Sequence, residues 1–406
     1  MNIIIDIIYY IVAFVAVYFM FLFLLLFIAH RKKLSNVPTM KKFPSLSIII
    51  PAYNEEKTIG KTIKAVKNLL YPKKFEIIVV NDSSTDKTCS IAKKFKDVKV
   101  ISKQKGGKAS ALNLGLKYAK GEIVACIDSD SYPERHALLR AVGFFEKKNV
   151  ASVTASIFVK NPRTIIQRLQ QIEYVITAWN RKLLQYLNSI YVTPGPMSLY
   201  RKDVLIKVGG FDEENLTEDI EIAWRLMRYR YKIRMSLDSN IYTTVPKTLK
   251  EWWHQRTRWS IGGLQTTSKY FHLFLNRSFS NLGMFLLPFF SVSYVLSILG
   301  LFLLSYIIFD WLIGFVYFII AYYKFGFGIS GFMTFSFMPD IFLVLGIFTF
   351  LLSVVYLRVN LTTMKRPIKY RRRAKELLIY LSVYGVIYPF NLIYSFFKFL
   401  LKKYEW

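Results

Sequence analysis

The stretch Glu122-Ile-Val-Ala-Cys-Ile127 is a short apolar run that leads directly into Asp128-Ser129-Asp130. A run of this length that ends in polar residues is typical of a buried β-strand. Two similar runs precede it, Leu46-Ser-Ile-Ile-Ile50 and Phe75-Glu-Ile-Ile-Val-Val80, and stretches with helical spacing separate all three. This alternation predicts βαβ units, and therefore an α/β fold with a mostly parallel sheet.

Carboxylates follow each of the predicted strands. Glu55 and Asp82 come shortly after the first two runs, and Asp128 and Asp130 come at the end of the third. In open α/β sheets, ligands bind at the carboxyl ends of the strands. We therefore expect these side chains to converge on one pocket.

Asp128 and Asp130 are candidate ligands of a divalent cation. Mg²⁺ and Mn²⁺ prefer oxygen ligands and accept bridging phosphates in their coordination shell. Such an ion would neutralise the charge that builds up on a departing diphosphate. A solvated turn is the commoner explanation of an isolated Asp-x-Asp, but the position directly after a buried strand favours the metal site.

Two other segments are candidates for contact with a nucleotide. We assign Asp82 to the uracil or ribose of the ligand, and Asp86 to the capping of the following helix. Lys105-Gly-Gly-Lys108 is not a Walker A loop, because Ser102 stands where that motif requires glycine. Lys108 therefore either faces a phosphate or lies in a solvated loop.

The catalytic candidate is Asp219, which belongs to Thr217-Glu218-Asp219 at the start of a stretch with helical spacing. Thr217 or Glu218 could simply cap that helix. As a general base, Asp219 would remove a proton from an acceptor hydroxyl. A helix start lowers the pKa of a carboxylate, whereas burial beside donor and acceptor raises it again.

A helix further along the chain carries Gln255, Arg258 and Trp259 in the pattern Gln-x-x-Arg-Trp. Gln255 and Arg258 can donate hydrogen bonds to a diphosphate, and the flat indole of Trp259 suits stacking on a sugar ring. Gln255 and Trp259 share a helix face with Trp252. For Trp252 and Trp253 we expect a position at a membrane interface, where tryptophan is enriched.

The first 30 residues predict a membrane anchor. Residues 3–28 contain one charge, Asp6, and as a helix they would extend about 39 Å, enough to cross a bilayer. A cleaved signal peptide is disfavoured, because no basic residue precedes the apolar run and the run is too long. The basic residues follow it in His30-Arg31-Lys32-Lys33, so the chain after residue 30 is expected in the cytoplasm.

The C-terminal part is apolar. Residues 281–309, 341–357 and 377–397 are uncharged, and each is a candidate span. Residues 311–323 are short for a crossing and are expected to be interfacial, re-entrant or packed in a hairpin. An even number of crossings before residue 358 keeps the basic residues that follow inside, which favours two crossings there and one more after residue 376.

The charge balance also indicates a membrane. Among 406 residues, 56 Lys and Arg stand against 26 Asp and Glu, with a formal net charge of +30 and a hydrophobic fraction of 53%. Nucleic-acid binding is one interpretation of this excess. However, residues 358–375 alone hold eight Lys or Arg and no acid, and each contributes about 1 kcal/mol of attraction near an anionic leaflet. We therefore expect lipids, and no nucleic acid, as partners.

Together these motifs resemble the membrane-embedded glycosyltransferases of family two. This family includes poly-β-1,6-N-acetylglucosamine, hyaluronan and chitin synthases, and the first of these branches is the most similar. The stretch Thr193-Pro-Gly-Pro-Met-Ser-Leu-Tyr-Arg201 is also similar to the acceptor-site stretch of hyaluronan synthases. The resemblance covers about residues 46 to 263 and rests on Pro51-Ala-Tyr-Asn-Glu-Glu56, Asp82, Lys108 through Asn113, Asp128-Ser-Asp130, Thr217-Glu-Asp219 and Gln255-Arg-Thr-Arg-Trp259.

The resemblance implies three parts: an anchor at 1–30, a cytoplasmic, Rossmann-like GT-A domain at 44–270, and transmembrane or interfacial helices at 281–398. It implies a UDP-sugar donor, Mg²⁺ or Mn²⁺, and inversion to a β-linkage. Asp219 would be the base, and Asp128 and Asp130 would bind the metal. Donor nucleotide and diphosphate would contact Pro51, Tyr53, Glu55, Asp82, Lys108, Asp128, Gln255 and Arg258, and the acceptor would contact Gly195, Glu218 and Trp259.

We therefore expect a multi-pass protein of the cell membrane that adds a sugar, with N-acetylglucosamine as the expected one, to a growing polysaccharide. Transfer of a single sugar to a lipid-linked acceptor is the alternative, and an accessory membrane subunit is left open as a partner. A non-catalytic protein that only binds a nucleotide or glycan is disfavoured, because it would need no base at Asp219.

Overall fold

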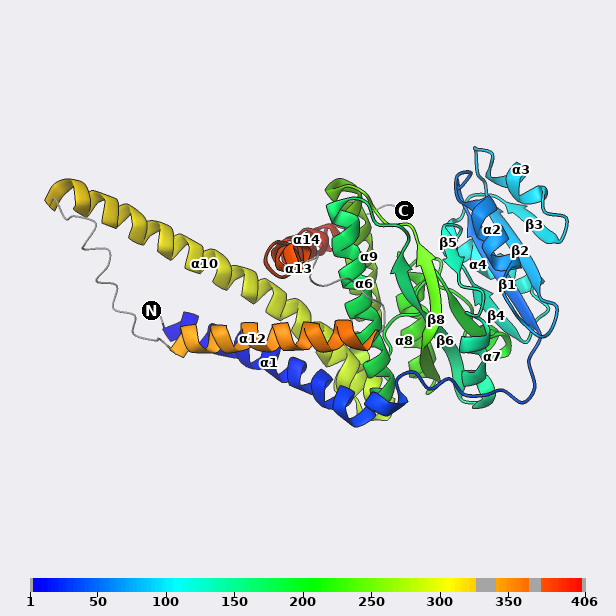
Figure 1. Ribbon diagram of the computed structural model, residues 1–406, viewed down its shortest axis with the longest axis horizontal. Coiled ribbons are helices and arrows are strands. Elements are labelled where there is room, and N and C mark those ends of the chain that lie inside the picture. The colour runs from blue at the N-terminus through cyan, green and yellow to red at the C-terminus, as the bar shows by residue number, and fades with distance from the viewer. Residues whose placement is uncertain (1–2, 326–340, 365–373, 404–406) are drawn as a thin grey trace.

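The computed structural model describes residues 3–325, 341–364 and 374–403. An α/β domain lies at one end of the molecule and long apolar helices extend from the other (Figure 1). Two long helices, α6 (Ile165–Leu184) and α9 (Leu249–Tyr270), lie between them. Both begin with a capping box, Thr164 with Gln167 and Thr248 with Glu251, which satisfies free backbone N–H groups in the first turn.

One eight-stranded sheet forms the centre of the domain, in the order β3-β2-β1-β4-β7-β6-β8-β5. β1 pairs in parallel with β2 and β4, β2 with β3, and β6 with β8. β7 is antiparallel to both of its neighbours, and β5 is antiparallel to β8. The mostly parallel sheet is confirmed. The strands are Leu46–Ala52, Glu76–Asp82, Val98–Lys103, Ile123–Cys126, Ser131–Pro133, Val150–Val159, Ser198–Arg201 and Lys232–Thr243, from β1 to β8.

The core has two layers, one on each face of the sheet. Ile49 of β1 belongs to one apolar cluster, whereas Ile48 and Ile50 belong to the other, because successive side chains of a strand point to opposite faces. Every residue of β1 is buried, which explains its continuous apolar sequence. Helix α4 (Gly107–Tyr118) approaches β1 closely at Gly115, where a Cβ would lie 2.5 Å from Ile49.

Shorter helices complete the domain. α8 (Glu218–Arg228) packs beside α9, and α2 (Ile59–Lys67) and α3 (Thr88–Lys93) lie near the β1–β3 end of the sheet (Figure 1). The remaining two are α5 (Leu139–Val142) and α7 (Lys202–Lys207).

Four helical segments of the described residues are long and apolar enough to cross a membrane: Ile3–Lys33, Leu282–Lys324, Val344–Thr363 and Lys375–Leu400. Helices α1 (Ile3–His30) and α12 (Ile341–Thr363) lie side by side. Helix α10 (Leu287–Phe325) is continuous over 39 residues. The expected re-entrant segment or hairpin at 311–323 is therefore wrong, because these residues continue the helix that begins at Leu287.

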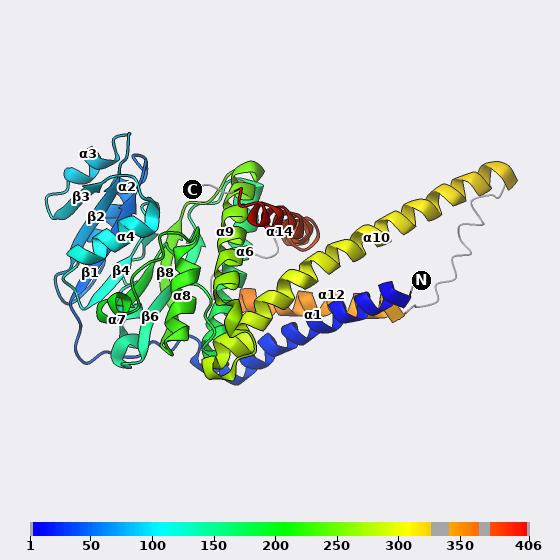
Figure 2. The ribbon, with the colours of Figure 1, turned by 180° about the vertical axis from the view of Figure 1, so that it is seen from behind.

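The last helices run in a different direction. After α13 (Ala374–Ile379) and a π-helical turn at Tyr380–Tyr384, helix α14 (Gly385–Leu400) packs along α9. It is seen almost end-on in Figure 1 and again in Figure 2, whereas α1 and α12 lie across both views. Helix α14 thus lies crosswise to α1 and α12.

Candidate active site

A small cavity lies where β1 and β4 end, between the sheet and the start of α8. Six residues expected at the donor, the acceptor or the catalytic step line it. Its full lining is Pro51, Lys108, Leu112, Cys126, Ile127, Asp128, Thr193, Gly195, Ser198, Tyr200, Phe211, Glu218 and Asp219.

Lys108 connects two acids in this cavity. Its Nζ lies 2.7 Å from Asp128 Oδ1 and 3.0 Å from Glu218 Oε1. Burial alone would lower the pKa of Lys108, but Asp128 and Glu218 outweigh it and raise the pKa well above the usual value. Lys108 belongs to α4 rather than to a solvated loop. A Cβ at Gly195 would come within 2.3 Å of the Lys108 Nζ, so only glycine leaves room for this ion pair.

Asp219 lies in the first turn of α8. Burial, followed by the neighbouring carboxylate of Glu218, raises its pKa to about 6, although Lys108 and Arg258 act in the opposite direction. The backbone of the same residue is fixed by Thr193, whose N–H and Oγ1 both donate to the Asp219 carbonyl oxygen, at 3.0 and 2.9 Å. A carboxylate with a pKa near the working pH is suited to general-base catalysis.

The second acid of the Asp-x-Asp pair has mainly hydroxyl neighbours. Asp130 accepts hydrogen bonds from Thr243 at 3.2 Å, from Ser131 at 3.3 Å and from Thr244. The pKa of Asp128 is raised, first by burial and further by the proximity of Asp130, against the effect of Lys108. Two carboxylates that repel each other at a strand end are a donor set that suits Mg²⁺ or Mn²⁺.

These two acids would form only part of a coordination shell. Among the described residues there is no group of three or more His, Cys, Asp or Glu side chains that could hold a metal. The remaining ligands would have to come from phosphate oxygens and water, as is usual for Mg²⁺ in nucleotide sites.

Asp82, expected to contact the nucleoside, holds a loop. Its carboxylate accepts hydrogen bonds from the backbone N–H groups of Gly106 and Gly107, at 2.9 and 2.8 Å, and pairs with Lys103 at 2.9 Å. The loop leads into α4, so Asp82 helps to position Lys108. Asp86 accepts a hydrogen bond from the Thr88 N–H at the start of α3, in keeping with its expected capping role.

Two residues after β1 lie near these groups without lining the cavity. Burial, with smaller contributions from Asp130 and Asp128, raises the pKa of Glu55 against a lowering hydrogen bond from Thr58. The ring of Tyr53 is partly exposed. The Nζ atom of Lys105 lies over this ring, 5.1 Å from its centroid.

Helix α9 passes directly beside the start of α8. A Cβ at Gly262 would lie 2.2 Å from Thr217 Oγ1, so this glycine permits the close approach. Arg258 Nη1 donates to the Leu216 carbonyl oxygen at 3.1 Å. This contact brings Arg258 close enough to Asp219 to lower its pKa. Gln255 and Trp259 do not line the cavity, and they have Arg256 as a common partner.

The expected interfacial position is wrong for Trp252. Its side chain is fully buried, and its Nε1 donates to Tyr384 Oη at 2.7 Å. A residue 132 positions away covers this indole, which local sequence does not reveal. Trp253 is half-buried against α14, where Asn391 Nδ2 donates to its carbonyl oxygen at 3.2 Å.

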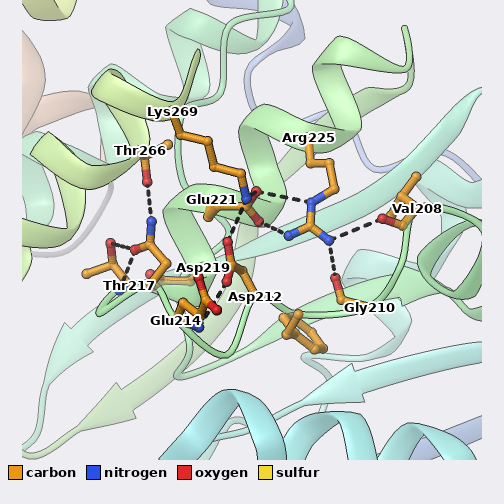
Figure 3. Close-up of polar contacts among 12 residues, drawn as sticks. Val208, Gly210, Asp212, Glu214, Thr217, Asp219, Glu221, Arg225, Thr266 and Lys269 are labelled. Carbon is orange, nitrogen blue, oxygen red and sulfur yellow. Dashed lines mark hydrogen bonds and ion pairs between the residues drawn. The ribbon is translucent and has the colours of Figure 1, made fainter. Parts of the chain in front are cut away.

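A buried charge cluster holds α8 against α9 (Figure 3). Glu221 accepts from Arg225 Nε at 3.1 Å and from Lys269 Nζ at 2.8 Å, and Arg225 Nη1 also donates to the carbonyl oxygens of Val208 and Gly210. This cluster was not predicted from the sequence. The four-residue spacing of Glu221 and Arg225 was a usable signal, whereas Lys269 had none.

The eight-stranded, mostly parallel sheet with its covering helices is a fold of the GT-A type. A solved structure, the mannosyltransferase PcManGT from Pyrobaculum calidifontis in complex with GDP-Man and Mn²⁺, shares this fold. Its TM-score is 0.61 at 19% identity, over 98% of this chain and 100% of that one.

Sequence comparisons find similar proteins. Residues 47–209 match the family model for glycosyl transferase family 2. The chain is 35% identical over 251 residues to the probable glycosyltransferase YdaM of Bacillus subtilis (strain 168), which covers 58% of this chain and 60% of that protein. It is also 35% identical over 224 residues to a poly-beta-1,6-N-acetyl-D-glucosamine synthase of Staphylococcus epidermidis, over 54% of each. These matches span between half and two thirds of the relatives' length.

Proposed function

We propose that this protein is a membrane-bound, inverting β-glycosyltransferase that transfers N-acetylglucosamine from UDP-N-acetylglucosamine to the end of a growing polysaccharide. The observation that carries the proposal is the single cavity that joins Asp219 to Lys108 and Asp128. It combines a base with a raised pKa and a charged group suited to a diphosphate. The donor sugar is supported by the poly-beta-1,6-N-acetyl-D-glucosamine synthases among the relatives.

In this proposal Asp219 accepts the proton of an acceptor hydroxyl as its oxygen attacks the anomeric carbon of the donor. The bond between that carbon and the β-phosphate oxygen breaks, and UDP leaves on the opposite face, which gives a β-linkage. Lys108 and Arg258 stabilise the negative charge that develops on the diphosphate. Gly195, Glu218 and Trp259 are assigned to the acceptor side, and Pro51, Tyr53, Glu55, Asp82 and Gln255 to the donor side.

Asp128 and Asp130 would hold Mg²⁺ or Mn²⁺ together with the donor. When bound, the ion supplies positive charge to the departing diphosphate. Lys108 already compensates Asp128 on one side, so one of the two carboxylate ligands is held in place before the donor arrives.

We further propose that residues 44–270 face the cytoplasm, between the anchor at 1–30 and the helices at 281–398. The basic residues Arg31–Lys33 lie at the end of α1 that is nearer the sheet, and the N-terminus lies at the far end (Figure 1). The positive-inside rule then assigns the sheet to the cytoplasmic side. Helices α1, α10 and α12 would cross the bilayer, and the crosswise α14 would lie at its surface.

The test is a donor screen. Purified protein in nanodiscs receives a panel of radiolabelled UDP-sugars with Mg²⁺ or Mn²⁺, and both UDP release and product size are measured. We expect release from UDP-N-acetylglucosamine and a polymeric product. A product with one sugar on a lipid would favour the alternative acceptor, and release of UDP from none of the donors would contradict the proposal. Activity of the chain alone also tests whether an accessory membrane subunit is required.

A further inference from the structure

A second charge cluster involves α9 and does not line the cavity. The guanidinium of Arg256 is completely buried. Its Nη2 lies 2.5 Å from Glu173 Oε2 of α6, and Tyr384, in the turn before α14, donates its hydroxyl hydrogen to the same carboxylate. We call Glu173, Arg256 and Tyr384 the helix joint, because they come from three different helical segments.

None of the three residues of the Gln-x-x-Arg-Trp pattern lines the cavity, and Arg256 contacts two of them, Gln255 and Trp259. Its Nη1 donates to Gln255 Oε1 at 3.0 Å, and its guanidinium lies 4.0 Å from the ring centroid of Trp259. At that distance a guanidinium over an indole face is held by a cation–π interaction. The orientation of both side chains therefore depends on where Arg256 lies.

The position of Arg256 is set in turn by its partners. Burial by itself lowers the pKa of Arg256, but the Glu173 carboxylate outweighs this effect and raises it. A buried charge that loses its partner is strongly destabilised, so the guanidinium has to remain where Glu173 lies. Tyr384 links this pair to α14, and its hydroxyl also accepts the Nε1–H of Trp252.

The two arginines of this turn of α9 thus face different surroundings. Arg258 is exposed and donates to Leu216, close to Thr217 and Asp219. Arg256 is sealed between α6 and the segment that leads into α14. A change in the helix joint should act first on Gln255 and Trp259, which Arg256 contacts directly.

We propose that Arg256 is a positioning residue that orients Trp259 toward the acceptor end of the glycan, with Glu173 and Tyr384 transmitting the position of α14 to it. This inference rests on the proposed function. It assigns to α14 an indirect role in acceptor binding.

The test separates acceptor from donor. A β-linked N-acetylglucosamine oligosaccharide serves as the acceptor probe in nanodiscs, and UDP affinity is measured by calorimetry. For Glu173→Gln we expect the KM for the oligosaccharide to rise about tenfold, the size of one lost charged hydrogen bond, and UDP affinity to fall less, because Gln255, the donor-side neighbour of Arg256, keeps its own side chain. Tyr384→Phe keeps the ring, and we expect a rise of about threefold from one neutral hydrogen bond.

The chain offers a matched control. Arg168 Nη1 and Glu376 Oε1 form an ion pair at 3.0 Å that also links α6 to the segment before α14, but it contacts neither Gln255 nor Trp259. Glu376→Gln should leave the KM for the oligosaccharide unchanged. An equal rise in the KM of this control would show that the helix joint only holds the helices together, like any other ion pair between them. That result would overturn the inference.

Other outcomes are equally decisive. An unchanged acceptor KM in Tyr384→Phe, or a loss of UDP affinity that matches the loss of acceptor binding, would overturn the inference even if Glu173→Gln failed to fold. If the wild-type protein released no UDP from any donor, the proposed function would fail and the inference with it. If the wild type transferred the sugar and the variants behaved like the control, only the inference would be refuted and the proposed function would stand.

Discussion

The ion pairs of Lys108 and of Arg256 differ in their access to water. Lys108 retains 32% of its side-chain exposure between Asp128 and Glu218, whereas Arg256 has none beside Glu173. A pair that water reaches can exchange a protein partner for a phosphate or a metal at modest cost. A sealed pair cannot exchange partners, because a buried charge left without its partner is strongly destabilised. The first arrangement suits ligand exchange and the second suits the fixing of geometry.

The largest effect is expected from the base on the accessible side. Asp219→Asn keeps the size of the side chain and removes its ability to accept the proton, so turnover should fall about 10²- to 10⁴-fold. UDP affinity, measured by calorimetry, should survive. The exposed Asp203→Asn in α7 is the control. Full turnover in Asp219→Asn would mean that another group is the base.

Lys108→Met tests the exchangeable pair itself. Without the ammonium group Asp128 and Glu218 face each other unpaired, and two charged contacts are lost from the donor site. We expect UDP affinity to fall about tenfold and kcat/KM to fall about a hundredfold, from losses of roughly 1.5–3 kcal/mol per charged hydrogen bond. Lys117→Met, on the exposed side of α4, is the control. Tighter UDP binding in Lys108→Met would show that the lysine competes with the donor instead of binding it.

The pH dependence should show the raised pKa of Asp219. The base has to be deprotonated, so kcat/KM should rise with pH up to about 6 and level off above it. Well below pH 6 the loss should approach about tenfold per pH unit. Circular dichroism at each pH separates this loss from unfolding. If kcat/KM instead fell only near pH 4, the base would have the pKa of an ordinary, solvent-accessible carboxylate.

The site around Lys108, which water reaches, could be predicted from the sequence, because local sequence patterns produce it. Short apolar runs end where Asp82 and Asp128 begin, and parallel pairing of β1 with β2 and β4 brings those ends to one edge. The antiparallel β7 was not foreseen, since Ser198–Arg201 is only four residues long and has no pattern of its own.

The buried pair of Glu173 and Arg256 could not be predicted in this way. Glu173 and Arg256 are 83 positions apart, and Trp252 and Tyr384 are 132 apart. Such partners are chosen by helix packing, which leaves no local periodicity around either residue. For the same reason, the tryptophan-rich sequence suggested a membrane-interface position for Trp252. In the structure Trp252 is fully buried next to the helix joint.

The smallest effect on catalysis is expected from Glu221 and its partners Arg225 and Lys269 in Figure 3, which pair neither with the carboxylate of Asp219 nor with the Gln-x-x-Arg-Trp side chains. Glu221 has no exposed side-chain surface and binds Arg225, Lys269 and Tyr270. Glu221→Gln leaves Arg225 without a buried counter-charge, so the free energy of unfolding should fall by about 3 kcal/mol. The melting temperature in detergent measures this loss.

At a temperature where the Glu221→Gln variant is still folded, its kcat/KM should lie within about threefold of the wild-type value, since only an indirect shift of α8 connects Glu221 to Asp219. The contrast with Lys108→Met then separates the two kinds of buried pair by their consequences, stability for one and ligand binding for the other. The kcat/KM of the folded Glu221→Gln variant could instead fall as far as that of Lys108→Met. In that case the start of α8 would have to move when its buried charges change. Access to water would then not be what distinguishes the Lys108 pair from the Glu221 pair.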